Sequence, residues 1–283
     1  MSAPAEAPAA ERGSNFYLGF LFLPKRKREA LAAVYAFCRL VDDIVDSPSL
    51  PKEEAARQLE FWRAEIERVY SGEPTHALGR RLQPFVREFM LPKEGFVELI
   101  RGMEMDLNKS RYETFADLEK YLFGAAGAVG LLCVEIFGYK KTSPQDVRKY
   151  AIAMGNAFQL TNILRDVGAD LEMGRIYLPL EDIREAGYSV EALLRREHNA
   201  WFQRLMGKEA ARAREFYRRA RNLLDPADRP AMLPAEVMAS IYEAVLDEIQ
   251  ERQFHVLFHR VRLSTWRKAS LAFGAFLRSH GIY

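Results

Sequence analysis

The segment Lys25–Asp46 reads KRKREALAAVYAFCRLVDDIVD, and it decides how the rest of the sequence is interpreted. Its apolar residues recur at the spacing of one helix face, which predicts an α-helix that begins after Pro24. Three carboxylates, Asp42, Asp43 and Asp46, lie within five residues at the end of this helix. Carboxylates repel one another and are costly to bury without a partner, so these three either face water or collect a cation.

The same helical spacing recurs along the chain, and no convincing strand alternation interrupts it. The sequence therefore predicts an all-α fold in a single domain over residues 14–283, preceded by a disordered, Ala- and Pro-rich tail over residues 1–13. We expect the further long helices over 51–70, 91–110, 114–137, 144–171, 198–224 and 234–261, and a shorter basic helix after Ser264.

Composition limits the class of protein. The 283 residues are 49% hydrophobic, which is enough for a sizeable core, and the net charge of +2 does not indicate nucleic-acid binding. Cys38 and Cys133 lie in apolar helical segments, as buried free thiols in a reducing compartment do. The apolar run Phe16–Pro24 is shorter than the roughly 20 residues that cross a bilayer. We expect a cytoplasmic protein, either soluble or peripheral at a membrane.

A second acidic cluster lies far from the first in the segment NILRDVGAD. Asn162, Asp166 and Asp170 are spaced i, i+4, i+8, which aligns their oxygens along one helix face with Arg165 beside them. The three aspartates of the first cluster share a face in the same way, and Arg39 joins them one turn earlier. Each cluster therefore combines acidic oxygens with an arginine.

Oxygen-only ligand sets suit Mg²⁺ or Mn²⁺, and Mg²⁺ commonly binds through carboxylates together with substrate phosphates. Two facing acidic helices would repel an anionic ligand unless divalent ions bridged them, in which case they would bind a diphosphate. One such triplet alone is usually a solvated face, but two on otherwise apolar helices favour a metal site.

Other features leave two interpretations open. The basic run Lys25–Arg28 and the C-terminal basic residues are solvated faces, or they attract diphosphate or anionic lipid; the latter are Arg260, Arg262, Arg267 and Lys268. The small residues of Gly124–Gly130 serve close helix packing or line a tunnel for apolar chains. Several aromatic residues are core or tunnel residues, namely Phe16, Phe20, Phe22, Tyr35 and Phe37.

Three segments resemble the squalene/phytoene synthases, which join prenyl diphosphates head to head. These are YAFCRLVDDIVD at 35–46, RGMEMDLNKSRYETFADLEKYLFGAAGAVG at 101–130 and QLTNILRDVGADLEMGRIYLP at 159–179, and the resemblance covers roughly residues 14–270. Within the family, the segments at 14–31 and 261–268 are most similar to the bacterial enzymes of hopanoid synthesis that make presqualene diphosphate.

The resemblance implies an isoprenoid-synthase helical bundle around a central cavity, with both aspartate motifs facing across it. It implies Mg²⁺, or Mn²⁺, held by Asp42, Asp43, Asp46, Asn162, Asp166 and Asp170. It further implies that the catalytic residues are Arg39, Arg165, Tyr121, Tyr177 and Tyr242, and that Arg39, Arg165, Tyr121, Asn162 and Tyr242 bind substrate.

The implied reaction condenses two farnesyl diphosphates to presqualene diphosphate, for use by downstream isoprenoid enzymes, without NADPH or nucleic acid. Phytoene, dehydrosqualene or squalene are alternative products, and squalene would require NADPH. A non-catalytic prenyl-binding or assembly protein of the same fold is the other alternative, although it would have no need of five motif aspartates. The chain departs from the family where Phe123 replaces a residue with an aromatic hydroxyl, which could alter the late carbocation steps.

Overall fold

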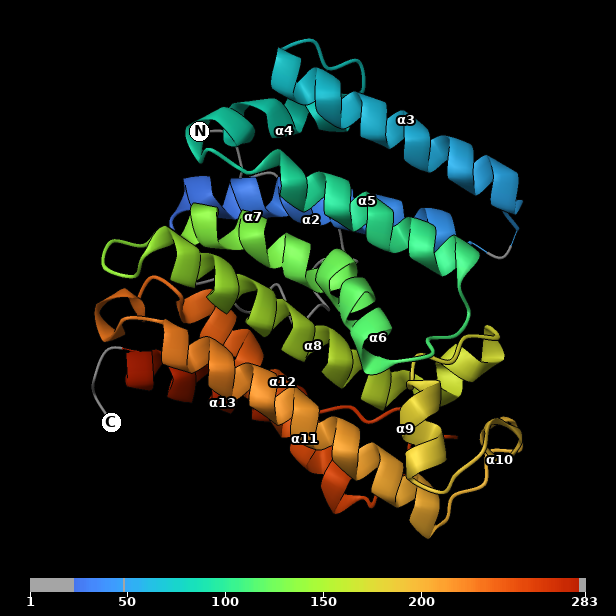
Figure 1. Cartoon of the computed structure of the whole chain (residues 1–283). Coiled ribbons are helices and arrows are strands. Elements are labelled where there is room, and N and C mark those ends of the chain that lie inside the picture. The colour runs from blue at the N-terminus through green and yellow to red at the C-terminus, as the bar shows by residue number, and fades with distance from the viewer. Residues whose placement is uncertain (1–22, 48, 280–283) are drawn as a thin grey trace.

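The computed structural model describes residues 23–47 and 49–279, and within these ranges it is helical with no strand (Figure 1). The only β-type contact in the described residues is an isolated bridge between Arg111 and Ile176. The predicted all-α class is therefore confirmed. The predicted tail, the predicted domain start at residue 14 and the aromatic residues Phe16, Phe20 and Phe22 lie outside the described residues.

The helices account for most of the described chain. In chain order they are α2 (Lys25–Asp46), α3 (Lys52–Ser71), α4 (Ala77–Glu88), α5 (Lys93–Asn108), α6 (Phe115–Leu122), the π-helical turn η1 (Phe123–Gly127), α7 (Ala128–Phe137), α8 (Pro144–Glu172), α9 (Leu180–Glu185), α10 (Val190–Leu194), α11 (Ala200–Leu223), the 3₁₀ turn η2 (Pro226–Asp228), α12 (Leu233–Glu251) and α13 (Thr265–Ser279).

Local sequence fixes where the helices begin. Ser143 caps α8, because its hydroxyl accepts the backbone N–H of Asp146, and Pro144 occupies the first turn, where no N–H is needed. Thr114 caps α6 in the same way through the N–H of Asp117. The predicted start of α2 after Pro24 and its end at Asp46 are both confirmed.

Two predicted helices have different boundaries in the structure. The helix expected over 114–137 is divided by the π-helical turn η1, and such turns inside α-helices are frequent at functional sites. The helix expected over 234–261 ends at Glu251, because Gln253 and Phe254 adopt positive φ angles of 50° and 61°. The helices α4, α9 and α10 were not predicted.

The long helix α8 lies at the centre of the bundle and contacts α7, α11 and α12 (Figure 1). Helices α3 and α4 cover α2 and α5 on one side, while α11, α12 and α13 form the opposite side. The span Phe115–Phe137 is apolar and long enough to cross a membrane by length and composition, but 61% of its most apolar window is buried among these helices. It is a core helix of this bundle.

Glycines let the central helices approach one another closely. A Cβ on Gly124 would lie 2.8 Å from the Cα of Gly102 in α5, and a Cβ on Gly130 would lie 2.5 Å from the carbonyl oxygen of Ala151 in α8. Both contacts are too short for any larger residue. The close-packing interpretation of this glycine-rich segment therefore holds, and Gly130 also lines the cavity described below, so both interpretations apply.

Candidate active site

A cavity of about 340 Å³ lies among α2, α5, α7, α8 and α12. Arg39, Asp42, Asn162 and Tyr242 line it together with Gln159 and form its polar part. The rest of the wall is mostly apolar and includes Leu99, Met103, Ala125, Val129, Val134, Phe137, Met154, Phe158 and Met238. A cavity with one polar part and an otherwise apolar wall suits a ligand that has a charged head and a hydrocarbon chain.

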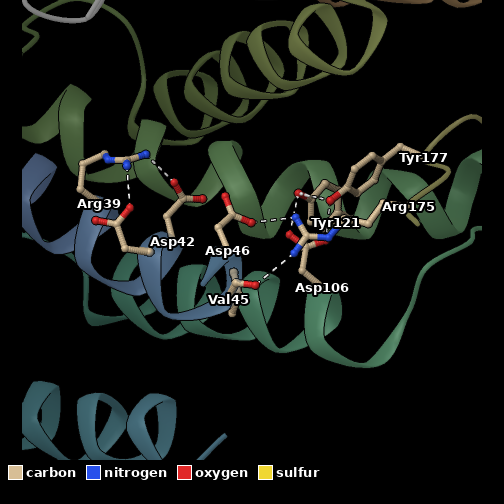
Figure 2. Close-up of polar contacts among 9 residues, drawn as sticks. Arg39, Asp42, Val45, Asp46, Asp106, Tyr121, Arg175 and Tyr177 are labelled. Carbon is tan, nitrogen blue, oxygen red and sulfur yellow. Dashed lines mark hydrogen bonds and ion pairs between the residues drawn. The ribbon is translucent and has the colours of Figure 1, made fainter. Parts of the chain in front are cut away.

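The first acidic motif is formed by the last turns of α2. Arg39 donates from Nη1 to Asp42 Oδ2 and from Nη2 to Asp43 Oδ1, both at 2.6 Å (Figure 2). Asp43 is the most exposed of the three aspartates, with 64% of its side chain accessible. The predicted grouping of Arg39 with the first motif is thus observed.

The third aspartate of this motif has a different partner. Asp46 Oδ1 accepts a hydrogen bond of 2.8 Å from Nη1 of Arg175, which follows α8 in the chain (Figure 2). The same guanidinium donates from Nη2 to the carbonyl oxygen of Val45 at 3.1 Å. Arg175 therefore ties the end of α2 to the segment that follows the second motif.

The second motif lies along α8. Asp166 forms ion pairs with Arg165, at 2.6 Å from Nη2, and with Arg260, at 2.7 Å from Nε. Arg260 comes from the segment between α12 and α13, and its place at the site favours the diphosphate interpretation of at least this C-terminal cation. The carboxylate of Asp170, in contrast, has no hydrogen-bond or ion-pair partner in the described part of the chain, although its backbone carbonyl accepts from the N–H of Arg175 at 2.8 Å.

The charges of the carboxyl groups in the two motifs raise one another's pKa values. Burial raises the pKa of Asp170 to about 8, and the charges of Asp166, Asp106 and Asp46 contribute to this rise. Burial likewise raises the pKa of Asp42 to about 6, with Asp46 adding to the effect. These mutual effects place the two motifs next to one another, as the resemblance implied.

The residues present fit a divalent cation. The carboxylate of Asp170 has no partner in the described residues, and the Oδ1 atom of Asn162, which lines the cavity, is buried without a hydrogen bond, so each end of the second motif holds an unsatisfied oxygen. Within residues 23–47 and 49–279, however, no three Asp, Glu, His or Cys side chains converge on one point; arginines contact several of the acids instead. Binding a cation would require Asp42, Asp46 and Asp166 to exchange these arginines for the ion.

The tyrosines Tyr121 and Tyr177 do not line the cavity but meet at a third acidic residue. Their hydroxyls donate to Asp106, at 2.9 Å to Oδ2 and 2.8 Å to Oδ1, and their rings stack with centroids 4.9 Å apart (Figure 2). Burial raises the pKa of both hydroxyls, and of Asp106 to about 6. Asp106 was not predicted; its position four residues before the break at Ser110 gave no signal in the sequence.

Other predicted residues are placed as follows. Tyr242 lines the cavity, and its ring lies 5.0 Å from that of Phe158, tilted by 44°. It is also close enough to Arg165 to help raise the pKa of that guanidinium. Phe123 is half-buried in η1 and does not line the cavity, so a phenylalanine here, in place of a residue with an aromatic hydroxyl, leaves the cavity wall unchanged. Cys38 and Cys133 are free thiols and both line the cavity.

The basic run at the start of α2 does not reach the site. Lys27 donates to the carbonyl oxygen of Phe137 at 2.6 Å, and Arg26 pairs with Glu88 at 2.6 Å. Arg28 donates to the carbonyl oxygen of Leu23. These contacts fasten the start of α2 to neighbouring segments, and the diphosphate and lipid interpretations of this run stay predictions.

An all-α bundle with two acidic motifs at the polar end of an apolar cavity defines a class of isoprenoid synthase. The model of the squalene/phytoene synthase family matches residues 9–267, and the chain belongs to this family. It is 34% identical over 268 residues to a 15-cis-phytoene synthase of Synechococcus elongatus, covering 92% of this chain and 87% of the relative.

Two solved structures share the fold. A dehydrosqualene synthase crystallised with a ligand superposes with a TM-score of 0.81 at 31% identity, covering 94% of this chain and 92% of that one. A squalene synthase from Alicyclobacillus acidocaldarius superposes with a TM-score of 0.76 at 28% identity, covering 87% of this chain and 97% of that one. The predicted family and the isoprenoid-synthase fold are confirmed.

Proposed function

We propose that this chain condenses two farnesyl diphosphates head to head to presqualene diphosphate. The observation that carries the proposal is the joining of both acidic motifs, through Arg175, beside the polar end of the apolar cavity. The names of the two structural neighbours, a dehydrosqualene and a squalene synthase, support a product built from fifteen-carbon units.

The first step would be departure of diphosphate from one substrate. The residues suited to hold Mg²⁺ are Asp42, Asp43, Asp46, Asn162, Asp166 and Asp170. Bound Mg²⁺ would offset the charge that develops on the departing diphosphate. Arg39, Arg165 and Arg260 pair with motif aspartates in the structure, and each is free to turn to the diphosphate once its aspartate takes another cation. Arginine suits this role because its planar group matches phosphate oxygens.

The remaining steps need a dry environment for an allylic cation. The apolar wall around Met103, Val129 and Phe158 keeps water from the cation, while Tyr242 and Phe158 offer ring faces that attract positive charge. Attack by the alkene of the second substrate forms the new carbon–carbon bond, and loss of a proton to the released diphosphate closes the cyclopropane. Tyr121 and Tyr177 keep their protons and donate them to Asp106 outside the cavity wall, so their role would be to hold this carboxylate in place.

Phytoene is the second candidate product. The curated relative that is 34% identical to this chain is named a phytoene synthase, and this favours a pair of twenty-carbon substrates. The structural neighbour that is named a dehydrosqualene synthase instead favours a pair of fifteen-carbon substrates. Phe123 carries no argument for either product, because it lies away from the cavity.

Product analysis distinguishes the candidates. The purified chain is incubated with farnesyl or geranylgeranyl diphosphate and Mg²⁺, with and without NADPH, and products are identified by mass spectrometry. We expect a thirty-carbon monodiphosphate from farnesyl diphosphate, with one diphosphate released per product and no effect of NADPH. A forty-carbon hydrocarbon formed only from geranylgeranyl diphosphate would establish phytoene synthesis, and no condensation from either substrate would overturn the proposal.

A further inference from the structure

The last helix, α13, carries an apolar face that points away from the bundle. Trp266 is 88% exposed and Phe273 is 61% exposed, and a spacing of seven residues puts both on the same side of the helix. The opposite side holds Ala272 and Ala275, which are 6% and 2% exposed and are the buried residues of this helix. Two large aromatic side chains are therefore presented to the surroundings in line along one helix.

The C-terminal segment is also strongly basic. Residues 252–283 hold six of the 41 Lys and Arg residues of the chain and none of its 39 Asp and Glu residues. This segment therefore carries a charge of +6, whereas residues 1–251, with 35 basic and 39 acidic residues, carry −4. The near-neutral net charge of the whole chain conceals this asymmetry.

Several of these cations have no carboxylate partner. Arg260 pairs with Asp166, and Arg252 and Arg267 both pair with Glu248. Across residues 23–47 and 49–279, Arg262 is exposed and pairs with no acid, and Arg278 bonds only to the hydroxyl of Ser240. Lys268 also pairs with no acid, but it lies on the inner side of α13, close enough to Arg165 for that charge to lower its pKa. On a helical projection Arg267 and Arg278 lie beside the aromatic face rather than within it.

We propose that the outer face of α13 docks on the surface of an anionic lipid bilayer. Trp and Phe on one face of a helix, bordered by Lys and Arg and without acids, is the pattern of helices that lie in the membrane interface. The aromatic rings enter the headgroup region, and the flanking cations attract anionic lipids. The proposal does not depend on the reaction that the cavity supports.

The charge of the segment argues against the other occupants of this face. A symmetric pair of copies joined through this face would bring Arg267 and Arg278 of both chains close together, and like charges at an interface oppose association. A nucleic acid would need cations at the centre of the contact, whereas Trp266, Ala269, Ser270 and Phe273 place uncharged residues there.

Sedimentation of the full chain with vesicles tests the proposal. We expect binding to vesicles of equal parts phosphatidylcholine and phosphatidylglycerol, weakened by salt, and little binding to phosphatidylcholine alone. Trp266→Ser/Phe273→Ser should weaken binding at least tenfold, and Arg262→Glu/Arg278→Glu should also weaken it. The matched control Met90→Ser/Leu194→Ser removes two side chains that are 80% and 54% exposed elsewhere, and should bind as the unmodified chain does.

The fluorescence of Trp266 gives a second measure of vesicle binding, and it leaves the proposed docking face unmodified. The chain has three tryptophans, of which Trp62 is 4% and Trp201 is 51% exposed, so a Trp201→Phe variant leaves Trp266 as the exposed indole. Anionic vesicles should shift its emission to shorter wavelength, and brominated lipid should quench it. The proposal is overturned if anionic vesicles do not change the emission of Trp266, or if the Trp266→Ser/Phe273→Ser variant still binds vesicles. It is also overturned if those substitutions instead dissociate a dimer or abolish binding to RNA.

Discussion

Arg175 and Asp46 form an ion pair of 2.8 Å although 129 positions separate them in the chain. Through this pair the segment after α8 reaches the last turn of α2, which supports the proposal that the two acidic motifs form one site. The positive charge of Arg175 also lowers the pKa values of Asp106 and Asp170. The negative charge of Asp106, in contrast, raises the pKa of Asp170. The guanidinium thus balances charge at the point where the motifs meet.

Replacing Arg175 with Gln should destabilise the protein in chelator by about 2 kcal/mol, the scale of a hydrogen bond to a charged group. The pKa of Asp106 is about 6 and that of Asp170 about 8, both above the value of 3.8 for an unperturbed carboxyl. The folded state therefore binds more protons, and its stability falls as pH rises from about 4 to 8. Without Arg175 this fall should be steeper, so the melting temperature of the variant should drop more at pH 8 than at pH 6.

Arg184→Gln is the matched control, because Arg184 pairs with Glu113 at an exposed site where both side chains are more than half accessible. We expect this variant to melt within about a degree of the unmodified protein, since exposed pairs contribute little. Equal melting of Arg175→Gln and Arg184→Gln at pH 8 would show that Arg175 does not balance the motif charges.

Asp106→Asn should lower kcat at least tenfold, or about 1.4 kcal/mol of barrier, with little change in the binding of inorganic diphosphate. The substitution keeps the size of the side chain but removes the charge that accepts from the hydroxyls of Tyr121 and Tyr177. If these groups act together, Asp106→Asn and Tyr177→Phe will be far from additive in a double-mutant cycle. Additive losses in kcat would contradict the shared role.

Gly168→Ala should destabilise the protein and weaken the second motif. A Cβ on Gly168 would lie 2.3 Å from the carbonyl oxygen of Leu257, so the segment carrying Arg260 would have to move away from Asp166. Gly207 in α11 has nothing within 4 Å of the same position, so Gly207→Ala should stabilise by about 1 kcal/mol through helix propensity alone. Urea unfolding should show a lower free energy of unfolding for Gly168→Ala and a higher one for Gly207→Ala, and effects of the same sign would contradict this prediction.

Asp228 should make stability depend on acid pH. Its carboxylate accepts backbone N–H bonds from Lys140, Lys141 and Thr142 at 2.6–2.9 Å, and these bonds hold its pKa at about 2, below 3.8. A depressed pKa adds stability above about pH 4 that is lost as pH falls toward 2. Asp228→Asn should therefore be about 2 kcal/mol less stable at pH 7, with the difference shrinking toward pH 2.

Urea unfolding at pH 7, 4 and 2 measures this difference. Asp247→Asn is the control, since Asp247 pairs with Arg214 at a site where both side chains are more than 40% accessible. A stability difference for Asp228→Asn that did not change between pH 7 and pH 2 would count against the assigned cause.

The sequence predicts correctly those helices that have clear start and stop signals. α2 begins and ends where Pro24 and the aspartates indicate, and Ser143 with Pro144 marks the start of α8. The π-helical turn η1 has no such signal, because its residues suit an α-helix, and the close approach of Gly124 to α5 becomes visible only in three dimensions. The early end of α12 at Glu251 was missed because neither Gln253 nor Phe254 is a residue that favours positive φ.

The site was predictable to the extent that its residues follow helix spacing. Arg39 with its aspartates, and Arg165 with Asp166, are neighbours in sequence and lie together as expected. Arg175, Arg260 and Asp106 reach the site from other segments through tertiary contacts that no local spacing encodes. The metal-binding role of the aspartates remains a prediction.

Calorimetric titration of inorganic diphosphate tests most directly whether the two motifs form one metal-dependent site. We expect binding to the unmodified protein with Mg²⁺ and at least tenfold weaker binding in chelator. Asp42→Asn in the first motif and Asp166→Asn in the second should each reduce the Mg²⁺-dependent binding, and the turnover of prenyl diphosphate, at least tenfold while melting as a folded protein. Equal affinity with and without Mg²⁺, or a loss confined to one motif, would contradict the account.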